Sequence, residues 1–456
     1  KGGNLVWQKA FGGSGTDVLT DVRQTKDKGY IMVGYSNSAD GDVTNVHSST
    51  DVWVVKTDID GNIQWQKCFG GTATDMGASV SVTDDDDIVV CASASSTDGD
   101  VTNNKGGSDV WLLNLNRKGK LQFQKTYGGS GNDYGKSAVL HADGTMVIAA
   151  SVESSNGDIT GAHGASDTWV FKLDAIGNIV FQKALGGTFN DYANKIDTAI
   201  GGGYIVAGST ASNDGDVSGN HGIAGTQEDG WIYKLDASGV KQWQLCLGGT
   251  DDEQLYSVVQ DKDSGYVICG ATASNDGDVT NNHRKFDVWI IKLTKTGTLL
   301  WQSCYGGTDR DEGRGIMTTK NTGEYFAIGY NASVDGDCTE NGGKTDVWLL
   351  RHVSGGGKPG NLTAKKAPVY VNDLNILISP NPVKDMMSIT FNADKNVQYH
   401  FALTDMNGKV IKTERLQSTV GSNTFSFNIS NLLKGIYHVQ LTEAGAKKIV
   451  TKIVKE

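Results

Sequence analysis

The sequence is poor in proline and in long apolar runs. It has only 4 prolines, all within the last 100 residues, against 60 glycines. No stretch approaches the roughly 18 consecutive apolar residues that a membrane-spanning helix needs, and residues 1–356 show no useful run of helical periodicity. The first residues, Lys-Gly-Gly-Asn, lead into a strand pattern without a signal-peptide segment. We expect any such segment to have been removed or to lie outside this chain.

Basic charge is scarce in most of the chain. Residues 357–456 carry 13 Lys and Arg against 7 Asp and Glu, whereas residues 1–356 carry 28 against 45. A change of charge and of turn composition at one place indicates two domains. Phosphate binding needs a basic surface, so the acidic part argues against nucleic acid as a partner.

What the sequence has in abundance is a repeat. An Asp-x-Trp tripeptide occurs six times, with its tryptophans 58, 58, 62, 58 and 59 residues apart. An aromatic-Gln dipeptide recurs with the same period, and the two anchors together hold all 10 tryptophans. β-Branched and aromatic segments bounded by Gly, Asn and Asp predict four strands per repeat, the first of them short (Ala78–Thr83 in the second repeat). The chain is therefore predicted to be all-β, with a six-bladed β-propeller over residues 1–353.

The two ends of the repeat region complement each other. Residues 4–10 have the pattern of a fourth strand with no other strand before it, and the last repeat ends near Val353 without a fourth strand. We interpret this as ring closure, in which the N-terminal strand completes the blade begun by residues 313–353. A closed ring removes open sheet edges. The Gly-Gly-Ser/Thr-Gly-x-Asp and Asp-Gly-Asp-Val-Thr elements resemble the bacterial SBBP β-propeller repeat family, which implies the architecture but no single activity.

The loops between the second and third predicted strands share an Asp-Gly-Asp motif, with Asn first in one repeat. Two carboxylates at i and i+2, with the Asp of Asp-x-Trp as a third, would offer oxygen ligands for Ca²⁺. The alternative, which we favour, is a structural turn in which the Asp side chains bond nearby backbone amides. The candidate calcium ligands are Asp40, Asp42, Asp98, Asp100, Asp214, Asp216, Asp276, Asp278, Asp335 and Asp337.

Two other recurrent residue types have simple interpretations. The repeated tryptophans suggest sugar-stacking platforms, but their strict positions in predicted strands favour packing between blades. Histidines recur in the Asp-Gly-Asp loops of different repeats, where hydrogen bonding or exposure is favoured over a shared metal. These histidines are His47, His163, His221 and His283.

Cysteine occupies both of two equivalent positions in two of the repeats. Cys68 and Cys91, and likewise Cys246 and Cys269, are separated by 23 residues. This coincidence suggests two disulfides in an oxidising compartment, with Cys304 and Cys338 left as free thiols. The alternative is that both positions accept small buried residues, because other repeats have Ala or Thr there.

No catalytic constellation is visible in the repeats. A binding site need not follow the repetition, so departures from it are the candidate binding loops, with drift in surface loops as the alternative. We predict a binding, adhesion or scaffold module with an unknown surface ligand, a glycan or a protein. The alternative is a secreted polysaccharide-degrading enzyme with carboxylates on the propeller axis. The candidate binding residues are Arg284, Lys285, Phe286, Asp309, Arg310, Asp311 and Arg314, with the insertion 223–228 and the turn 251–253 as further departures.

The last part of the chain has a different character. Residues 354–368 have the composition of a flexible linker, and residues 369–456 contain seven short predicted strands that fit an Ig-like β-sandwich. Its motifs run in the order found in type IX secretion sorting domains of type A, which this domain resembles. The residues that carry the resemblance are Pro380, Asn381, Pro382, Asp405, Asn407, Gly408, Lys434, Gly435, Tyr437 and Lys452.

This resemblance implies a route for the protein. It implies a Gram-negative bacterium of the Bacteroidetes group, passage through the outer membrane by the type IX translocon, and recognition of the domain by an outer-membrane shuttle protein. A sortase-like protease then usually removes the domain and links the cargo to surface lipopolysaccharide. The expected location is therefore secreted or on the cell surface.

Overall fold

The computed structural model of the chain describes residues 7–47, 49–83, 86–319, 323–338, 344–353, 377–379, 384–393, 396–405, 409–443 and 448–455. Every regular element within these ranges is a β-strand, and no helix there is long and apolar enough to cross a membrane. The chain divides into two compact units, one of Val6–Gly355 and one of Lys1–Leu5 with Gly356–Glu456. The all-β prediction is confirmed.

The first unit consists of consecutive antiparallel sheets, numbered 1 to 6, each running through its strands in chain order. Sheet 1 contains β1 (Asp17–Gln24), β2 (Tyr30–Ser36), β3 (Asp51–Thr57) and β4 (Ile63–Phe69). Sheet 2 contains β5 (Asp75–Val82), β6 (Ile88–Ala94), β7 (Asp109–Leu115) and β8 (Leu121–Tyr127). Sheet 3 contains β9 (Asp133–Leu140), β10 (Met146–Val152), β11 (Asp167–Leu173) and β12 (Ile179–Leu185).

The remaining sheets of this unit repeat the arrangement. Sheet 4 contains β13 (Asp191–Thr198), β14 (Tyr204–Thr210), β15 (Asp229–Leu235) and β16 (Lys241–Leu247). Sheet 5 contains β17 (Glu253–Gln260), β18 (Tyr266–Thr272), β19 (Asp287–Leu293) and β20 (Leu299–Tyr305). Sheet 6 has three strands in the described residues, β21 (Asp311–Thr318), β22 (Glu324–Asn331) and β23 (Asp346–Val353).

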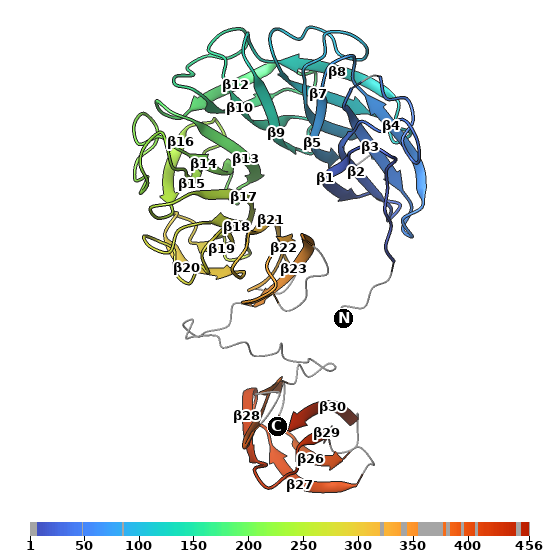
Figure 1. Cartoon of the computed structure of the whole chain (residues 1–456), viewed down its shortest axis with the longest axis vertical. Coiled ribbons are helices and arrows are strands. Elements are labelled where there is room, and N and C mark those ends of the chain that lie inside the picture. The colour runs from blue at the N-terminus through green and yellow to red at the C-terminus, as the bar shows by residue number, and fades with distance from the viewer. Residues whose placement is uncertain are drawn as a thin grey trace. The chain divides into compact units, whose positions relative to one another are not determined.

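The first strand of each sheet is longer than the sequence suggests. In sheet 2 it begins at Asp75 rather than at Ala78, because the Asp75 amide donates to the Thr50 carbonyl at 2.7 Å and holds this end of the strand against sheet 1. Each first strand from β5 onward contacts the first three strands of the preceding sheet. The sheets therefore follow one another along an arc, with the first strands on its inner side (Figure 1).

Two repeated side chains explain the period of the sequence. The indole of each Asp-x-Trp tryptophan in sheets 1 to 5 is fully buried, as predicted. Its Nε1 donates to the Gln of the neighbouring fourth strand, at 2.8 Å from Trp111 to Gln124 and at 3.0 Å from Trp53 to Gln66. The two anchors recur together because each buried indole needs this acceptor. The same bond occurs at Trp169, Trp231 and Trp289.

The fourth-strand aromatic residues join one sheet to the next. Trp65 of β4 donates to the Arg117 carbonyl of sheet 2 at 3.2 Å. Trp7 makes the same contact with sheet 1, since its Nε1 donates to the Ile59 carbonyl at 3.0 Å. Residues 7–10 are nevertheless outside any strand, and among the described residues β23 pairs with β22 alone. Closure of the ring by the N-terminal strand stays a prediction.

The second unit contains two sheets. One has the order β24 (Leu377–Ser379), β25 (Met386–Ala393), β28 (Gly421–Asn428), and the other has the order β27 (Val410–Gln417), β26 (Gln398–Asp405), β29 (Gly435–Glu443), β30 (Lys448–Lys455). Both sheets contribute to one hydrophobic cluster. In it, Phe401 of β26 stacks on Phe427 of β28 with ring centroids 4.1 Å apart.

Candidate functional site

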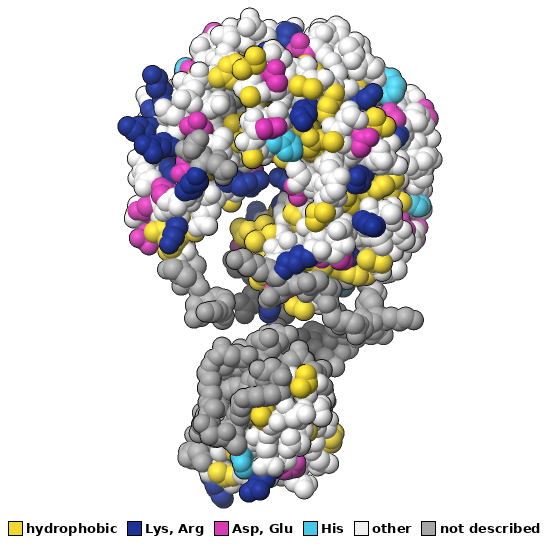
Figure 2. Space-filling model, turned by 180° about the vertical axis from the view of Figure 1, so that it is seen from behind, with side chains coloured by type: hydrophobic (Ala, Val, Ile, Leu, Met, Phe, Trp, Pro, Cys, Tyr) yellow, Lys and Arg dark blue, Asp and Glu magenta, His cyan; other side chains and the backbone are white. Residues whose placement is uncertain are grey.

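The first strands of all six sheets of the first unit line one cavity. Its volume is about 760 Å³, and we call it the axial cavity. Figure 2 shows the opening in this unit, with Lys and Arg side chains beside it. The cavity brings together segments as far apart in sequence as Thr20 in β1 and Arg314 in β21. A single ligand bound in it would meet every sheet of this unit.

One position of the first strand departs from the repetition in every sheet. The first residue of this strand is Asp in five sheets and Glu253 in the other. The fourth residue, in contrast, is of a different type each time, and all six fourth residues line the axial cavity. We call this set the variable ring: Thr20, Ala78, Lys136, Asn194, Tyr256 and Arg314.

The fifth residue of the first strand accepts a hydrogen bond from the next first strand in three of the six sheets, through Asp21, Ser79 and Ser257. The amide of Val80 donates to Asp21 Oδ2 at 3.1 Å, and the amide of Ala138 donates to Ser79 Oγ at 3.1 Å, so each of these side chains holds the next first strand. Sheet 4 has Lys195 at this position, and an ammonium group cannot accept a hydrogen bond. Lys195 also lines the axial cavity. This lysine is therefore not explained by the contact that three of its equivalents make.

The cavity lining is more cationic than the acidic unit around it. Two of its cations have carboxylate partners: Arg23 pairs with Asp21 at 2.5 Å, and Arg314 pairs with Glu312 at 2.5 Å. Arg314 also lies over the Tyr256 ring, 3.9 Å from its centroid. Lys136 and Lys195 have no ion pair among the described residues, which leaves two ammonium groups in the cavity without a direct carboxylate partner.

Burial shifts the pKa of the charged groups in this cavity. It lowers the pKa of Lys136 and the pKa of Lys195 from the usual value for a lysine. The charges of Asp21 and Asp197 partly oppose this shift at Lys195, while no carboxylate opposes it at Lys136. Burial also raises the pKa of Asp197. Charged groups without full compensation are what a ligand of the opposite charge would satisfy.

A second cavity adjoins the first on one side. Its volume is about 460 Å³, and it shares Thr20, Ala78 and Lys136 with the axial cavity. Two tyrosines line it, Tyr35 and Tyr134. The Lys136 ammonium lies 5.4 Å from the centroid of the Tyr134 ring. Lys136 thus sits where a polar cavity meets an aromatic wall.

The predicted binding loops of sheets 5 and 6 come together in the structure. Lys285 pairs with Asp309 at 2.8 Å, and the Arg310 guanidinium lies 4.4 Å from the centroid of the Phe286 ring. Arg284 precedes them with a positive φ of 136°. Asp311 is buried and accepts from the Gly307 amide at 2.9 Å, which is a structural contact. Only Arg314 of this predicted set lines the axial cavity.

The other axial residues escaped the sequence reasoning. That reasoning looked for departures in loops, whereas Arg23, Lys136, Lys195 and Tyr256 lie within the first strands. A signal was present, because alignment of the six first strands shows one fully variable position between repeated neighbours. Comparison of equivalent positions in the six first strands identifies the variable ring.

The Asp-Gly-Asp loops bond to the backbone of their own sheet. In sheet 2, Asp98 accepts from the Thr72 amide at 2.8 Å, and Asp100 accepts from the Gly70 amide at 3.3 Å. The amides equivalent to that of Thr72 donate to Asp40, Asp214, Asp276 and Asp335. The amides equivalent to that of Gly70 donate to Asp42, Asp278 and Asp337. Asp216 instead pairs with Lys241 at 2.7 Å. The described residues contain no group of three or more His, Cys, Asp or Glu suited to hold a metal ion.

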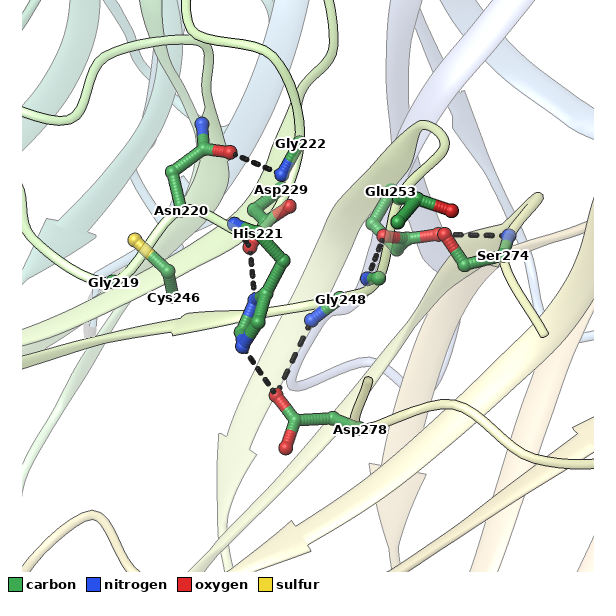
Figure 3. Close-up of polar contacts among 12 residues, drawn as sticks. Gly219, Asn220, His221, Gly222, Asp229, Cys246, Gly248, Glu253, Ser274 and Asp278 are labelled. Carbon is green, nitrogen blue, oxygen red and sulfur yellow. Dashed lines mark hydrogen bonds and ion pairs between the residues drawn. The ribbon is translucent and has the colours of Figure 1, made fainter. Parts of the chain in front are cut away.

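The loop histidines serve the boundaries between sheets. His221 Nδ1 lies 2.7 Å from Asp229 Oδ2 within sheet 4, and its Nε2 lies 3.9 Å from Asp278 Oδ2 of sheet 5 (Figure 3). His47, His163 and His283 make the equivalent contact with the Asp of Asp-x-Trp. The carboxylate partners raise the pKa of His221 against the opposing effect of burial.

Pairs of buried carboxyl groups flank the same boundaries. A Cβ on Gly248 would lie 2.3 Å from Glu253 and 2.9 Å from Asp229, so glycine is needed between them. Burial raises the pKa of Glu253 to about 7, and it raises the pKa of Asp109, Asp191 and Asp287 at other boundaries to about 6. One oxygen of Asp229 is buried without a hydrogen-bond partner. These pairs favour the protonated form of one member.

The cysteines do not form the predicted disulfides. All six are free and buried. Cys68 lies on the fourth strand of sheet 1 and Cys91 on the second strand of sheet 2, and their side chains belong to different hydrophobic clusters. Cys246 and Cys269 are separated in the same way. The equal spacing of 23 residues arises because both positions are small and buried, as the alternative interpretation held.

The sorting residues divide between described and undescribed parts of the chain. Asp405 accepts from the Lys409 amide at 2.9 Å, Lys434 is exposed before β29, Gly435 begins β29, and Lys452 lies in β30. The Tyr437 hydroxyl donates to the Leu433 carbonyl at 2.9 Å. Pro380, Asn381, Pro382, Asn407 and Gly408 lie outside the described residues.

Comparison with known proteins gives a distant relative over part of the chain. The chain is similar to regulatory protein FlaEY of Caulobacter vibrioides, with 28% identity over 162 residues. This match covers 34% of the chain and spans 17% of that protein.

Solved structures with a similar arrangement are also distant. The Pan2 WD40 domain of Neurospora crassa has a TM-score of 0.38 at 9% identity, covering 70% of this chain and 75% of that one. Sqt1 from Chaetomium thermophilum also has a TM-score of 0.38, at 12% identity, covering 75% and 83%.

A family match falls on the second unit. The secretion system C-terminal sorting domain family matches residues 377–456. This range spans all seven strands of the two facing sheets. Residues 377–456 are therefore a secretion system C-terminal sorting domain of the type IX class, carried behind a β-propeller-like unit.

Proposed function

We propose that this protein is a type IX secretion cargo whose first unit is an extracellular ligand-binding module. The observation that carries the export part is the sorting-domain match over residues 377–456. In a Bacteroidetes host, the second unit would be recognised by an outer-membrane shuttle protein and then removed by a sortase-like protease. The first unit would remain at the cell surface or in the medium, as an adhesion or scaffold module.

Export is tested by comparing the full chain with a variant that lacks residues 377–456. In a host with a working translocon, the full chain is expected outside the cell and the shortened variant in the periplasm. In a host without the translocon, both are expected in the periplasm. Release of the shortened variant to the medium would contradict the role of the sorting domain.

We further propose that the first unit is a closed six-bladed propeller with residues 4–10 as its last strand, and that the second unit is an Ig-like sandwich after the linker 354–368. Two faces that are buried at every other boundary support the closure. Val347 and Leu349 of β23 are 77% and 63% exposed, whereas the equivalent Val288 and Ile290 are 1% and 0% exposed. On β1, Val22 is 50% exposed, whereas the equivalent Val80 is 1% exposed. The exposed apolar side chains of β23 and of β1 are the ones that would cover each other in a closed ring.

The ligand site of this module is the axial cavity. The observation that carries this proposal is the variable ring, because six equivalent positions with six different residue types line one cavity of about 760 Å³. Repetition serves the fold, so a position that departs from it in every sheet is free to serve a ligand. Binding without turnover is expected when the purified chain is mixed with surface glycans.

A second candidate function is a polysaccharide-degrading activity at the same cavity. Asp21 and Asp197 both line it, and burial raises the pKa of Asp197, as general acid catalysis requires. Shortened oligosaccharide products, detected by chromatography and lost in Asp197→Asn, would favour this activity over simple binding. Intact oligosaccharide after prolonged incubation would favour the binding module.

A further inference from the structure

The variable ring has an unusual charge balance. It contains two cations, Lys136 and Arg314, and no carboxylate. Three of its other members already have hydrogen-bond partners: Asn194 Nδ2 donates to the Leu255 carbonyl at 3.0 Å, Thr20 Oγ1 donates to the Gly77 carbonyl at 3.0 Å, and the Tyr256 hydroxyl donates to Gln254 of its own strand. What this level of the cavity offers to a ligand is positive charge.

Lys136 is the cation with the least internal compensation. Arg314 already has Glu312 at 2.5 Å and the Tyr256 ring beneath it. Lys136 has no hydrogen bond or ion pair among the described residues. Its ammonium group instead makes a cation–π contact with the Tyr134 ring. Burial lowers the pKa of Lys136 without a carboxylate to oppose it. A bound anion would restore the missing partner through a charge-assisted hydrogen bond.

The aromatic wall beside Lys136 indicates what the anion is attached to. Tyr134 is 37% exposed, and with Tyr35 it lines the second cavity that Lys136 shares. Aromatic faces next to a polar cavity suit the apolar face of a sugar ring. Nucleic acid fits poorly, because the rest of residues 1–356 is acidic and would repel a chain of phosphates.

We propose that the axial cavity binds an acidic oligosaccharide, with a carboxylate or sulfate group held by Lys136 at the variable ring and a sugar ring against Tyr134. This inference rests on the proposed binding function and names its ligand class. Lys195 offers a second cation in the lining of the same cavity, at the position where Asp21 and Ser79 accept hydrogen bonds in sheets 1 and 2. The two lysines would favour a chain with more than one acidic unit.

The test uses the full chain and three defined probes in calorimetric titration at low salt. The probes are a trigalacturonate, which carries carboxylates, a sulfated oligosaccharide from carrageenan, and neutral cellotriose. We expect one or both acidic probes to bind at least about tenfold more tightly than cellotriose. The acidic probe that binds identifies whether the anion is a carboxylate or a sulfate.

The matched variants are Lys136→Gln and Lys183→Gln, since Lys183 is an exposed lysine on β12 of the same sheet. Lys136→Gln is expected to weaken the acidic probe about tenfold or more, and Lys183→Gln to leave it unchanged. Melting temperatures check that both variants are folded, and Tyr134→Ala provides a second route to weakened binding. Loss of binding in Lys136→Gln with an unchanged melting temperature supports the site.

The outcomes separate this inference from the binding function. If cellotriose binds as tightly as the acidic probes, or if Lys136→Gln binds them normally, the anion site is refuted while a binding module remains. The inference is also refuted if every probe has a dissociation constant above about 10 mM, which corresponds to a binding free energy weaker than about 3 kcal/mol. If the acidic probe binds through Lys136 and is cleaved, the anion site stands and the non-enzymatic function fails.

Discussion

The register of ring closure can be predicted to the residue. In sheet 5, Ile290 of the third strand lies opposite Ser303 of the fourth. By the repeat, Leu349 of β23 then lies opposite Lys9, and the indole of Trp348 meets the side chain of Gln8. Cysteines at Lys9 and Leu349 would be a directly opposed pair, within the reach of a disulfide.

The magnitude follows from the exposed faces. The exposed fractions of Val347, Leu349 and Val22 amount together to about two complete side chains. At about 2 kcal/mol for each fully buried Val or Leu, closure removes apolar surface worth about 4 kcal/mol from water. The Trp348–Gln8 hydrogen bond adds about 1 kcal/mol. This is a large share of the stability of a domain, so the closed form is expected to dominate.

The assay is disulfide formation in the double variant Lys9→Cys, Leu349→Cys under mild oxidation. Peptide mapping is expected to find an intramolecular bridge, and the oxidised protein is expected to be about 3 kcal/mol more stable than the reduced one. The native thiols interfere little, because they are buried and burial raises the pKa of Cys68 to about 12. The control pair Lys9→Cys, Arg351→Cys is displaced by two residues. Equal or faster bridging in the control, or bridging only between molecules, would refute the register.

Three further predictions concern the first unit. Because burial holds the pKa of Asp109, Asp191 and Asp287 near 6 and that of Glu253 near 7, the folded state retains protons between about pH 4 and 7 that the unfolded state releases. The free energy of unfolding therefore falls as pH rises through this window, by about 3 kcal/mol per carboxyl group, and the melting temperature at pH 5 should exceed that at pH 8, with the difference reduced in Asp109→Asn. Chelation of divalent ions should leave the melting temperature unchanged, since Asp98 and Asp100 already accept backbone amides, and a fall on chelation that added Ca²⁺ reverses would instead establish calcium sites. Gln124→Leu leaves the buried Trp111 indole without its acceptor and should cost about 1–3 kcal/mol in chemical denaturation, whereas the neighbouring exposed Gln122→Leu should cost little; equal costs would contradict the role of the bond.

Much of the fold was predictable because the same pattern of apolar and turn residues recurs in every repeat. Apolar alternation and turn residues place the strands of both units, and the seven strands predicted in residues 369–456 all appear in the structure. The first strands were predicted too short, because the contact that starts them, from the Asp75 amide to the Thr50 carbonyl, joins two sheets and leaves no mark on local sequence.

The candidate site was harder to predict for the same physical reason. Which residues of a strand face a shared cavity depends on how six sheets are arranged, not on any one of them. Arg314 was singled out because its charged segment was interpreted as a turn, although it lies in β21, while Lys136 and Lys195 stand in ordinary strand sequence. The disulfide prediction failed on the same point, since equal spacing in sequence put Cys68 and Cys91 in different sheets.

The separation between repeated and varied positions along one strand has a consequence for how such proteins diversify. The residues that join neighbouring sheets through the Asp75 amide and the Trp65 indole occupy sites away from the variable ring. A substitution at Ala78 or Lys136 can therefore change what the interior recognises while these contacts between sheets stay the same. Replaceable positions around one opening form a combinatorial recognition surface, and a single scaffold of this kind could be retuned to many extracellular ligands by point mutation alone.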